Sequence, residues 1–381
     1  MAYFDNNATT PLFPGVVEAM SEALAGAWAN PSSPYRDAAR VRALMNQARE
    51  EMAESFGVNP GDLTFTSSAT EANNSVFTSL ANEGFDQHRV LLSPVEHPCV
   101  SEPVRRYFSD RFSVLSTDVN GCICLDSLES ELKSSSNPIL VGVMAASNET
   151  GVIQPWKQVA QLCAEYQADF HCDATQWIGK MDPTDLSLCS SFTASAHKFG
   201  GPKGVGVLVS SKEHSFLLGG GQEKGKRAGT ENYPAIEGMR VAWRVCQSKN
   251  LTISERESWR DSFEERILGL DSGFKLLGKN APRLWNTSTF LVPCFDNQNW
   301  ISKLDKIGFQ VSTGSACASM GTSTAPMVEL YHLSAGESSR LIRVSSFWGH
   351  SAEDWIALGE AFEKAFGLLK DDSSSSSVIS I

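Results

Sequence analysis

The chain has 381 residues and a formal net charge of −12, with 41% hydrophobic and 20% charged residues. These proportions are typical of a soluble globular protein, and the length allows two domains. The acidic balance argues against direct binding of nucleic acid, and no apolar run approaches the roughly 20 residues that span a bilayer, which argues against a membrane protein. Because the first motif begins at Tyr3, which leaves no room for a targeting peptide, we expect a cytoplasmic protein.

Helical and apolar segments alternate along the first part of the chain. Helical patterns are predicted over residues 14–27 and from about 35 to 56. Short apolar runs predict strands at residues 63–66, 90–93, 139–144, 168–171 and 191–194. This alternation predicts an α/β fold with a mostly parallel sheet that helices cover on both faces.

A polar junction at residues 248–255 divides the sequence. We expect a large domain over residues 14–250 and a smaller α+β domain formed by residues 1–13 and 251–370. Residues 371–381 are rich in serine and begin with two aspartates, a composition typical of a disordered end.

Lys198 lies where a polar, β-branched strand meets the turn Gly-Gly-Pro-Lys-Gly. A lysine at such a corner can be partly desolvated, and the lowered pKa of its amine is what covalent bonding to an aldehyde requires. A solvated lysine beside a turn is the alternative. Asp173 ends an apolar run, and in open α/β sheets ligands bind at the carboxyl ends of the strands. Asp173 could pair with the ring nitrogen of pyridoxal phosphate or equally cap the next helix.

Three further positions carry chemistry-bearing residues. Residues 66–74 follow a strand and open a helix, so their N–H groups and hydroxyls offer an anion site, or simply cap the helix together with Glu71. His97 follows the next strand, and this place favours proton transfer over a purely structural role. Arg343 lies in an apolar run, where a guanidinium needs a partner, and its planar fork suits a carboxylate.

The nine cysteines include no Cys-x-x-Cys pair, which argues against a disulfide framework or a zinc ribbon, and we expect no metal. Cys317 is surrounded by small residues between positions 312 and 321. This context favours an exposed thiol on a loop over a buried, inert cysteine. Such a thiol can act as a nucleophile near neutral pH when a cation or a proton acceptor is close.

These blocks, in this order from residues 3–11 to Arg343, resemble the cysteine desulfurases of the NifS/IscS type, which are class V aminotransferases among the fold-type-I pyridoxal phosphate enzymes. The resemblance implies a mostly parallel, seven-stranded sheet in the large domain, with a smaller α+β domain beside it. It also implies that Lys198 holds pyridoxal 5′-phosphate covalently, that Asp173 pairs with the ring nitrogen, and that Gln176 binds the phenolic oxygen.

The resemblance assigns the remaining ligands as well. His97 would stack on the ring and move protons, Arg343 would bind the substrate carboxylate, and Asn148 would orient cofactor or substrate. The residues implied to bind the phosphate are Ala69, Thr70, Ser195, His197 and Thr230. Thr230 would come from the neighbouring subunit, so the resemblance implies a homodimer with shared active sites.

The implied reaction removes sulfur from L-cysteine, releases L-alanine and leaves a persulfide on Cys317 for a protein acceptor, as in iron–sulfur cluster biogenesis. Ser68, Gln222 and Thr313 depart from the common pattern of the family, which bears on the rate and the acceptor more than on the reaction class. The nearest alternative is a selenocysteine lyase or another class V enzyme that acts on an amino acid without Cys317. A non-catalytic assembly partner that keeps the fold is a further alternative.

Overall fold

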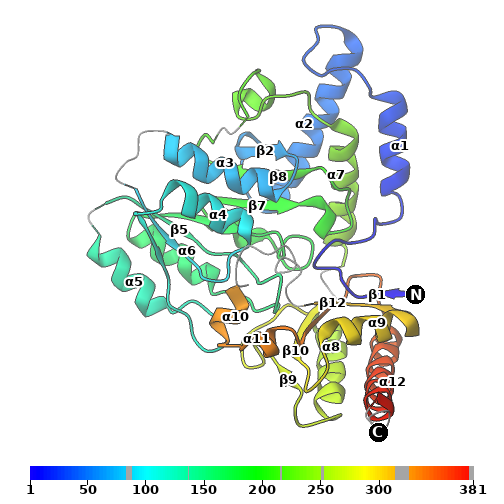
Figure 1. Cartoon of the computed structure of the whole chain (residues 1–381). Helices are drawn as coiled ribbons and strands as arrows, with labels where there is room; N and C mark the ends of the chain where they lie inside the picture. Colours follow the sequence, from blue (N-terminus) through cyan, green and yellow to red (C-terminus); the bar gives the residue numbers. More distant parts are fainter. Residues whose placement is uncertain (83–87, 136, 215–216, 250–252, 314–325, 377–381) are drawn as a thin grey trace.

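The computed structural model describes residues 1–82, 88–135, 137–214, 217–249, 253–313 and 326–376. A seven-stranded sheet forms the centre of the larger part of the molecule (Figure 1). Its strands in spatial order are β2 (Leu63–Thr66), β8 (Gly206–Ser210), β7 (Ser191–Ser195), β6 (Asp169–Asp173), β5 (Ile139–Gly142), β3 (Arg89–Leu92) and β4 (Phe112–Val114). Strand β8 is antiparallel to both neighbours, and the other neighbouring pairs are parallel. The expected mostly parallel α/β sheet is confirmed.

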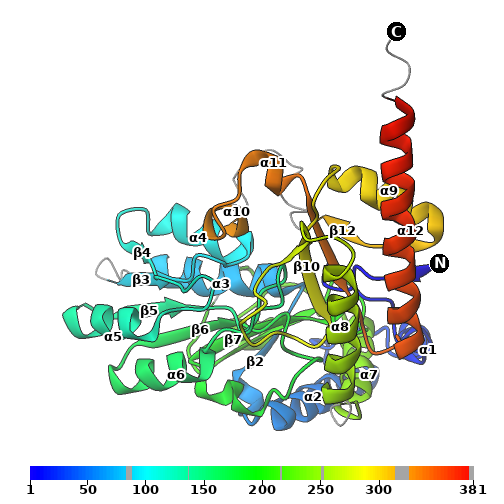
Figure 2. The ribbon, with the colours of Figure 1, turned by 90° about the horizontal axis from the view of Figure 1, so that it is seen from below.

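Helices cover both faces of this sheet (Figure 2). Successive side chains of a strand point to opposite faces, so Val90 and Leu92 of β3 belong to one apolar cluster and Leu91 to another. The helices of the first face are α3 (Ala69–Asn82) and α4 (Pro98–Tyr107). Those of the second are α2 (Arg36–Phe56), α5 (Leu125–Ser134), α6 (Trp156–Glu165) and α7 (Tyr233–Gln247), with α1 (Val16–Gly26) packed on α7.

A second, antiparallel sheet lies beside the first. Its strands in spatial order are β12 (Ser312–Thr313), β13 (Leu341–Ser345), β10 (Thr287–Leu291) and β9 (Lys275–Leu276). The helices of this part are α8 (Ile253–Leu268), α9 (Asn297–Ile307), α10 (Pro326–Leu330), α11 (Ala335–Ser338) and α12 (Ala352–Ser376). The rings of Phe263, Trp300 and Phe362 are buried in an apolar cluster of this part, separate from the clusters of the large sheet. Burying such side chains contributes about 1.5–3 kcal/mol each.

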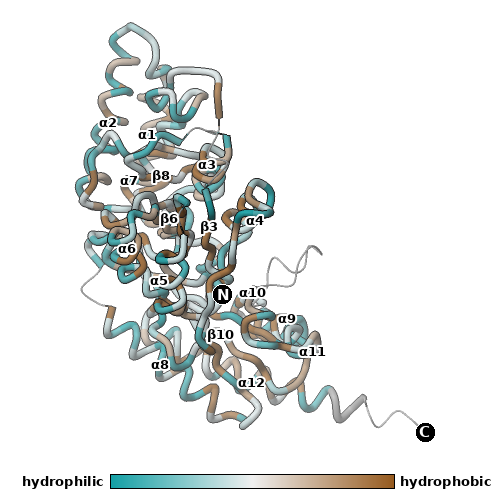
Figure 3. Tube along the Cα trace, turned by 90° about the vertical axis from the view of Figure 1, so that its left-hand side faces the viewer, coloured by the Kyte–Doolittle hydropathy of each residue, from teal (hydrophilic) through white to brown (hydrophobic). Residues whose placement is uncertain are grey.

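Helix α8 is predominantly hydrophilic (Figure 3), yet one of its faces is buried. Arg256, Arg260 and Glu264 are each less than a tenth exposed. Glu264 accepts hydrogen bonds of 2.5 and 2.6 Å from the two terminal nitrogens of Arg283. This buried ion pair fixes the start of the segment that leads into β10.

The N-terminal segment joins the two sheets. Strand β1 (Ala2–Tyr3) pairs with β11 (Phe309–Gln310) in parallel, and Asn6 N–H donates to the carbonyl of Ser345 at 3.1 Å. A few residues later, Thr10 N–H donates to the carbonyl of His197 at 2.8 Å. Residues 5–10 therefore connect β13 to the turn that follows β7.

The C-terminal helix α12 is longer than expected. It continues to Ser376, so the expectation of disorder is wrong for residues 371–376, while residues 377–381 lie outside the described residues. Asp372 pairs with Lys303 of α9 at 2.6 Å, a tertiary contact that supports the added turns. No helix in the described part of the chain is long and apolar enough to cross a membrane.

Candidate active site

A cavity of about 330 Å³ opens where β5, β6 and β7 end and the N-terminal segment passes β13. Of the predicted site residues that the structure describes, its lining includes every one except Thr230. Those brought together are Ala69, Thr70, His97, Asn148, Asp173, Gln176, Ser195, His197, Lys198 and Arg343. Ligands of open α/β sheets bind at this edge, because the carboxyl ends of the parallel strands meet there.

Lys198 follows β7 at the end of a single 3-10 turn. Its Nζ donates to the carbonyls of Asn7 at 2.6 Å and Ala8 at 2.8 Å. Burial, and then the charge of Arg343, lower the pKa of Lys198 from 10.5 to about 8. The amine is therefore partly neutral near physiological pH, as a nucleophilic lysine must be.

The turn behind Lys198 requires glycine. Gly200 has a φ of +84°, and a Cβ atom there would lie 2.2 Å from the ring of Phe13. The N–H of Gly200 donates to Thr10 Oγ1 at 2.7 Å. The Gly-Gly element of the motif thus lets the N-terminal segment approach Lys198 closely.

Asp173 ends β6, is buried and faces the cavity. Its Oδ1 accepts from the N–H of Thr175 at 2.9 Å and so stabilises a turn. No helix begins at this turn, and the next helical residues are Thr184–Leu188, so the alternative that Asp173 caps the next helix is wrong. Its Oδ2 accepts from Asn73 Nδ2 at 3.0 Å. The amide of Asn73 is itself oriented, because its Oδ1 meets Thr193 Oγ1 at 2.9 Å and His171 Nε2 at 2.8 Å.

The start of α3, where the sequence predicts an anion site, lines the cavity. The N–H of Ala69, the first helical residue, donates to Ser195 Oγ at 2.7 Å, and Thr70 and His197 line the same cavity. Glu71 accepts from the N–H of Ser67 at 2.9 Å, so the capping interpretation holds alongside it. Orphan N–H groups at a helix N-terminus attract anions.

His97 caps α4 at the edge of the cavity. Its Nδ1 accepts from the N–H of Cys99 at 3.1 Å, and burial lowers its pKa, so the neutral ring carries its proton on Nε2. Cys99 was not predicted, although its Sγ lies 3.0 Å from Nδ1 of His97 and 4.0 Å from Oδ2 of Asp173. A cysteine on an amphipathic helix resembles any core residue, so the sequence carried no signal for it.

Arg343 lies in the middle of β13, with its side chain only 4% exposed. Its Nη2 donates to Asp5 Oδ1 at 2.7 Å and its Nη1 to the carbonyl of Asn148 at 3.0 Å. Among the described residues, its Nε has no partner. The protein thus holds the guanidinium by one hydrogen of each terminal nitrogen, and the Nε–H donor is left over.

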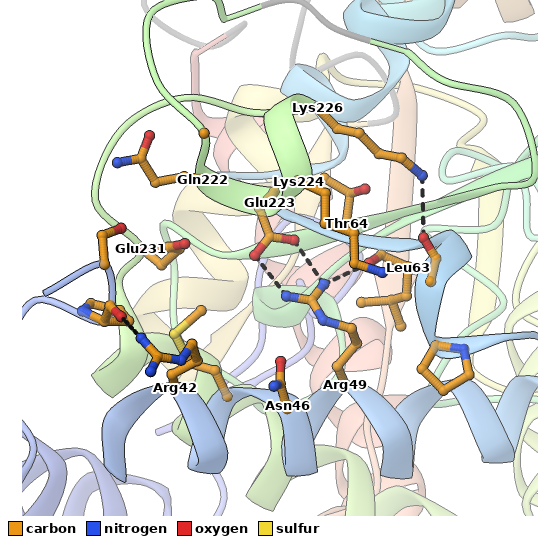
Figure 4. Close-up of a pocket in the computed structure, with 16 residues that line it drawn as sticks. Arg42, Asn46, Arg49, Leu63, Thr64, Gln222, Glu223, Lys224, Lys226 and Glu231 are labelled. Carbon is orange, nitrogen blue, oxygen red and sulfur yellow. Dashed lines mark hydrogen bonds and ion pairs between the residues drawn. The ribbon is translucent and has the colours of Figure 1, made fainter. Parts of the chain in front are cut away.

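Thr230 lies away from this cavity and is exposed. It follows a loop that lines a second cavity of about 320 Å³ against α2 (Figure 4). Glu223 in that loop accepts two hydrogen bonds of 2.7 Å from Arg49 and one of 2.9 Å from the N–H of Phe65. Arg227 binds Glu71 at 2.8 Å, so the loop is fixed next to the start of α3. Cys317 lies outside the described residues.

Comparisons with known proteins show the family to which the chain belongs. The sequence matches the family described as aminotransferase class-V over residues 2–355. A cysteine desulfurase of Trichormus azollae is 33% identical over 323 residues, which cover 83% of this chain and 80% of that protein. The structure of a NifS-like protein from Rickettsia africae ESF-5 has a TM-score of 0.86 at 27% identity and covers 96% of this chain and 99% of that one. The structure of SspA in complex with cysteine has a TM-score of 0.78 at 29% identity, covering 91% and 98%.

Proposed function

Since this chain belongs to the class-V aminotransferase family, among its cysteine desulfurases, we propose that it removes the sulfur of L-cysteine with pyridoxal phosphate as cofactor. The observation that carries the proposal is the partly neutral, half-buried Lys198 in a cavity that also contains Asp173, Gln176 and the start of α3. The complex of SspA with cysteine supports the choice of substrate.

The donors and acceptors of the cavity fit the chemical groups of the cofactor. An amine, Lys198, is available for the aldehyde, and a carboxylate, Asp173, for the ring nitrogen. Gln176 would donate to the phenolic oxygen, while Ala69, Thr70, Ser195 and His197 surround the place proposed for the phosphate. When bound, the cofactor supplies an electron sink that stabilises negative charge on the substrate carbon.

The protein side of the reaction then follows. Arg343 binds the substrate carboxylate, with Asn148 orienting the substrate. The thiolate of Cys317 attacks the substrate sulfur; an S–S bond forms, the C–S bond breaks, and its electron pair stays on carbon. Lys198, with His97 as a second proton carrier, removes the proton of the substrate Cα before the Cβ–S bond breaks and returns protons to Cβ and Cα afterwards, which yields L-alanine and a persulfide on Cys317.

We further propose a cytoplasmic homodimer with shared active sites that passes its persulfide sulfur to a protein acceptor, as in iron–sulfur cluster biogenesis. Thr230 supports the shared site, because it is exposed, lies outside its own cavity and follows a loop fixed by two ion pairs. A partner subunit can therefore receive this residue without rearrangement of the loop.

The decisive experiment is an absorbance spectrum of the purified protein with pyridoxal phosphate, followed by L-cysteine and assays of alanine and sulfide under reductant. We expect a visible band that Lys198→Ala removes, and alanine formation that requires Cys317. Turnover of selenocysteine that persists in Cys317→Ser, without turnover of cysteine, would instead indicate the lyase. Absence of the visible band would indicate a non-catalytic assembly partner that keeps the fold of the family.

A further inference from the structure

Lys180 is a second lysine next to the cavity, and the reaction described above does not use it. It follows β6 by seven residues and is completely inaccessible to solvent. Its Nζ donates to Gln176 Oε1 and lies 3.5 Å from Asn7 Oδ1. In the described part of the chain, no carboxylate pairs with it.

A buried ammonium without a counter-ion is costly, so a methionine or leucine would fill this space at lower cost. Burial, followed by the charges of Lys198 and Arg343, lowers the pKa of Lys180 well below its usual value. A neutral amine still carries N–H bonds. The contact with Gln176 therefore survives the loss of the charge.

The partners of Gln176 determine how its amide is oriented. Nε2 lies 3.1 Å from the carbonyl of Asn7, which can only accept a hydrogen bond. Oε1 must therefore face Lys180, which supplies the donor that this oxygen needs. Nε2 has two hydrogens, and no described residue takes the second one, so it remains available to a ligand in the cavity that Gln176 lines.

We propose that Lys180 is a positioning residue, which holds the amide of Gln176 with its NH2 group toward the cavity so that it can donate to an oxygen of the bound ligand. This inference rests on the proposed function only for the identity of that oxygen, the phenolic oxygen of pyridoxal phosphate. Asn7 extends the arrangement to the catalytic lysine, because its side chain faces Lys180 while its carbonyl accepts from Lys198 at 2.6 Å.

A purely structural role accounts for less of what is observed. The indole of Trp285 donates to the backbone carbonyl of Lys180 at 3.0 Å, a contact that any residue at this position would supply. What only an amine supplies is a donor that reaches Gln176 Oε1. The two roles can therefore be separated by changing the end of the side chain and keeping its backbone.

The test uses Lys180→Met, Gln176→Leu and the double variant, each loaded with pyridoxal phosphate. The readouts are the pH midpoint of the visible absorbance and the Kd of the cofactor, neither of which requires turnover. Without the amide donor the phenolic oxygen becomes more basic, so both single variants should raise the midpoint by at least about half a pH unit, a roughly threefold change in the proton equilibrium. The double variant should shift it no further than Gln176→Leu, because both act on one interaction.

The control is Trp285→Phe, which removes the hydrogen bond to the backbone of Lys180 and leaves its amine unchanged; its midpoint should equal that of the wild type. A Lys180→Met midpoint equal to the wild type, with Gln176→Leu shifted, overturns the proposal. If Lys180→Met does not fold, Lys180→Gln serves in its place and should raise the midpoint in the same way. The glutamine side chain is one atom shorter than lysine, so its NH2 group cannot reach Gln176. A wild type without a visible band would contradict the proposed function. A visible band whose pH midpoint does not depend on Lys180 would contradict only the inference about Lys180.

Discussion

Asp5 accepts a hydrogen bond of 2.7 Å from Nη2 of Arg343, although the two residues are 338 positions apart. The carboxylate therefore occupies one branch of the guanidinium that is proposed to bind the substrate. The side chain of Asp5 is 23% exposed and that of Arg343 4%, so the pair is only partly screened by solvent.

Replacing Asp5 by Asn should strengthen substrate binding. The change removes a negative charge next to the incoming carboxylate and leaves only a neutral acceptor for Nη2, so we expect KM for L-cysteine to fall by about three- to tenfold, which corresponds to about 1 kcal/mol. Steady-state kinetics of alanine formation measure this. Arg343→Lys is the matched comparison and should raise KM more than tenfold, because a lysine cannot form the planar fork. An unchanged or higher KM in Asp5→Asn would show that Asp5 positions the guanidinium and does not compete with the substrate.

Lys198→Met should stabilise the cofactor-free protein at neutral pH. Since burial lowers the pKa of Lys198 from 10.5 to about 8, its charged form is penalised in the folded state below pH 8 by at most about 3 kcal/mol. The unfolded chain keeps the proton up to about pH 10.5, so wild-type stability recovers between pH 8 and 10.5, and the advantage of the variant disappears there. Urea unfolding of the wild type and the variant at pH 7 and pH 10 measures the stability difference at neutral pH and its decrease at high pH.

The neighbouring, exposed Lys203 supplies the control for this measurement, since Lys203→Met should change the free energy of unfolding by less than about 0.5 kcal/mol. A Lys198→Met variant less stable than the wild type at pH 7 would mean that the hydrogen bonds to Asn7 and Ala8 outweigh the cost of burial.

The two cysteines proposed to lie near the reaction should differ in function. Burial, and then the negative charge of Asp173, raise the pKa of the Cys99 thiol. This thiol therefore stays protonated and is a poor nucleophile. Cys99→Ala should keep alanine formation within about threefold, whereas Cys317→Ser should lower it by more than about a hundredfold. Mass spectrometry should find the persulfide on Cys317 in the Cys99→Ala variant. A persulfide on Cys99, or turnover without Cys317, would contradict this assignment.

A mixing experiment tests the shared active site. Thr230→Ala and Lys198→Ala should each be impaired, the first at limiting cofactor because one phosphate ligand is lost. If Thr230 acts across the dimer, a heterodimer of the two variants contains one intact site. Random mixing after mild dissociation should then restore about a quarter of the wild-type sites. A mixture that only averages the two parent activities would place Thr230 in its own subunit's site or outside any site.

The sequence predicted much of the site because most of the functional side chains follow strands at turns. Asp173, His97 and Lys198 each stand just after an apolar run, and the parallel topology brings such positions to one edge. No comparable pattern in the sequence predicts the ion pair of Asp5 with Arg343, because this pair forms only when two segments far apart in the sequence meet. No pattern predicts the position of Lys180 either, because a lysine after a glycine is normally solvated.

The C-terminal helix also depends on a tertiary contact that the sequence pattern does not predict. The composition of residues 371–376 predicts disorder, and the continuation of α12 depends in part on the contact of Asp372 with Lys303, which composition does not contain. The division into domains at residue 250 stays a prediction, and so do the roles of all the predicted site residues, those that line the cavity as well as Thr230 and Cys317.

The N-terminal segment between the two sheets also has a consequence for biosynthesis. Asn6 and Asn7 are held by Ser345 of β13, and Lys198 donates to the carbonyls of Asn7 and Ala8. During translation the large sheet can therefore assemble early, but the pocket stays incomplete until β13 has left the ribosome and captured the first residues. Contacts of such sequence separation form slowly. A nascent chain would thus acquire its competence to retain cofactor late, after most of its core is in place.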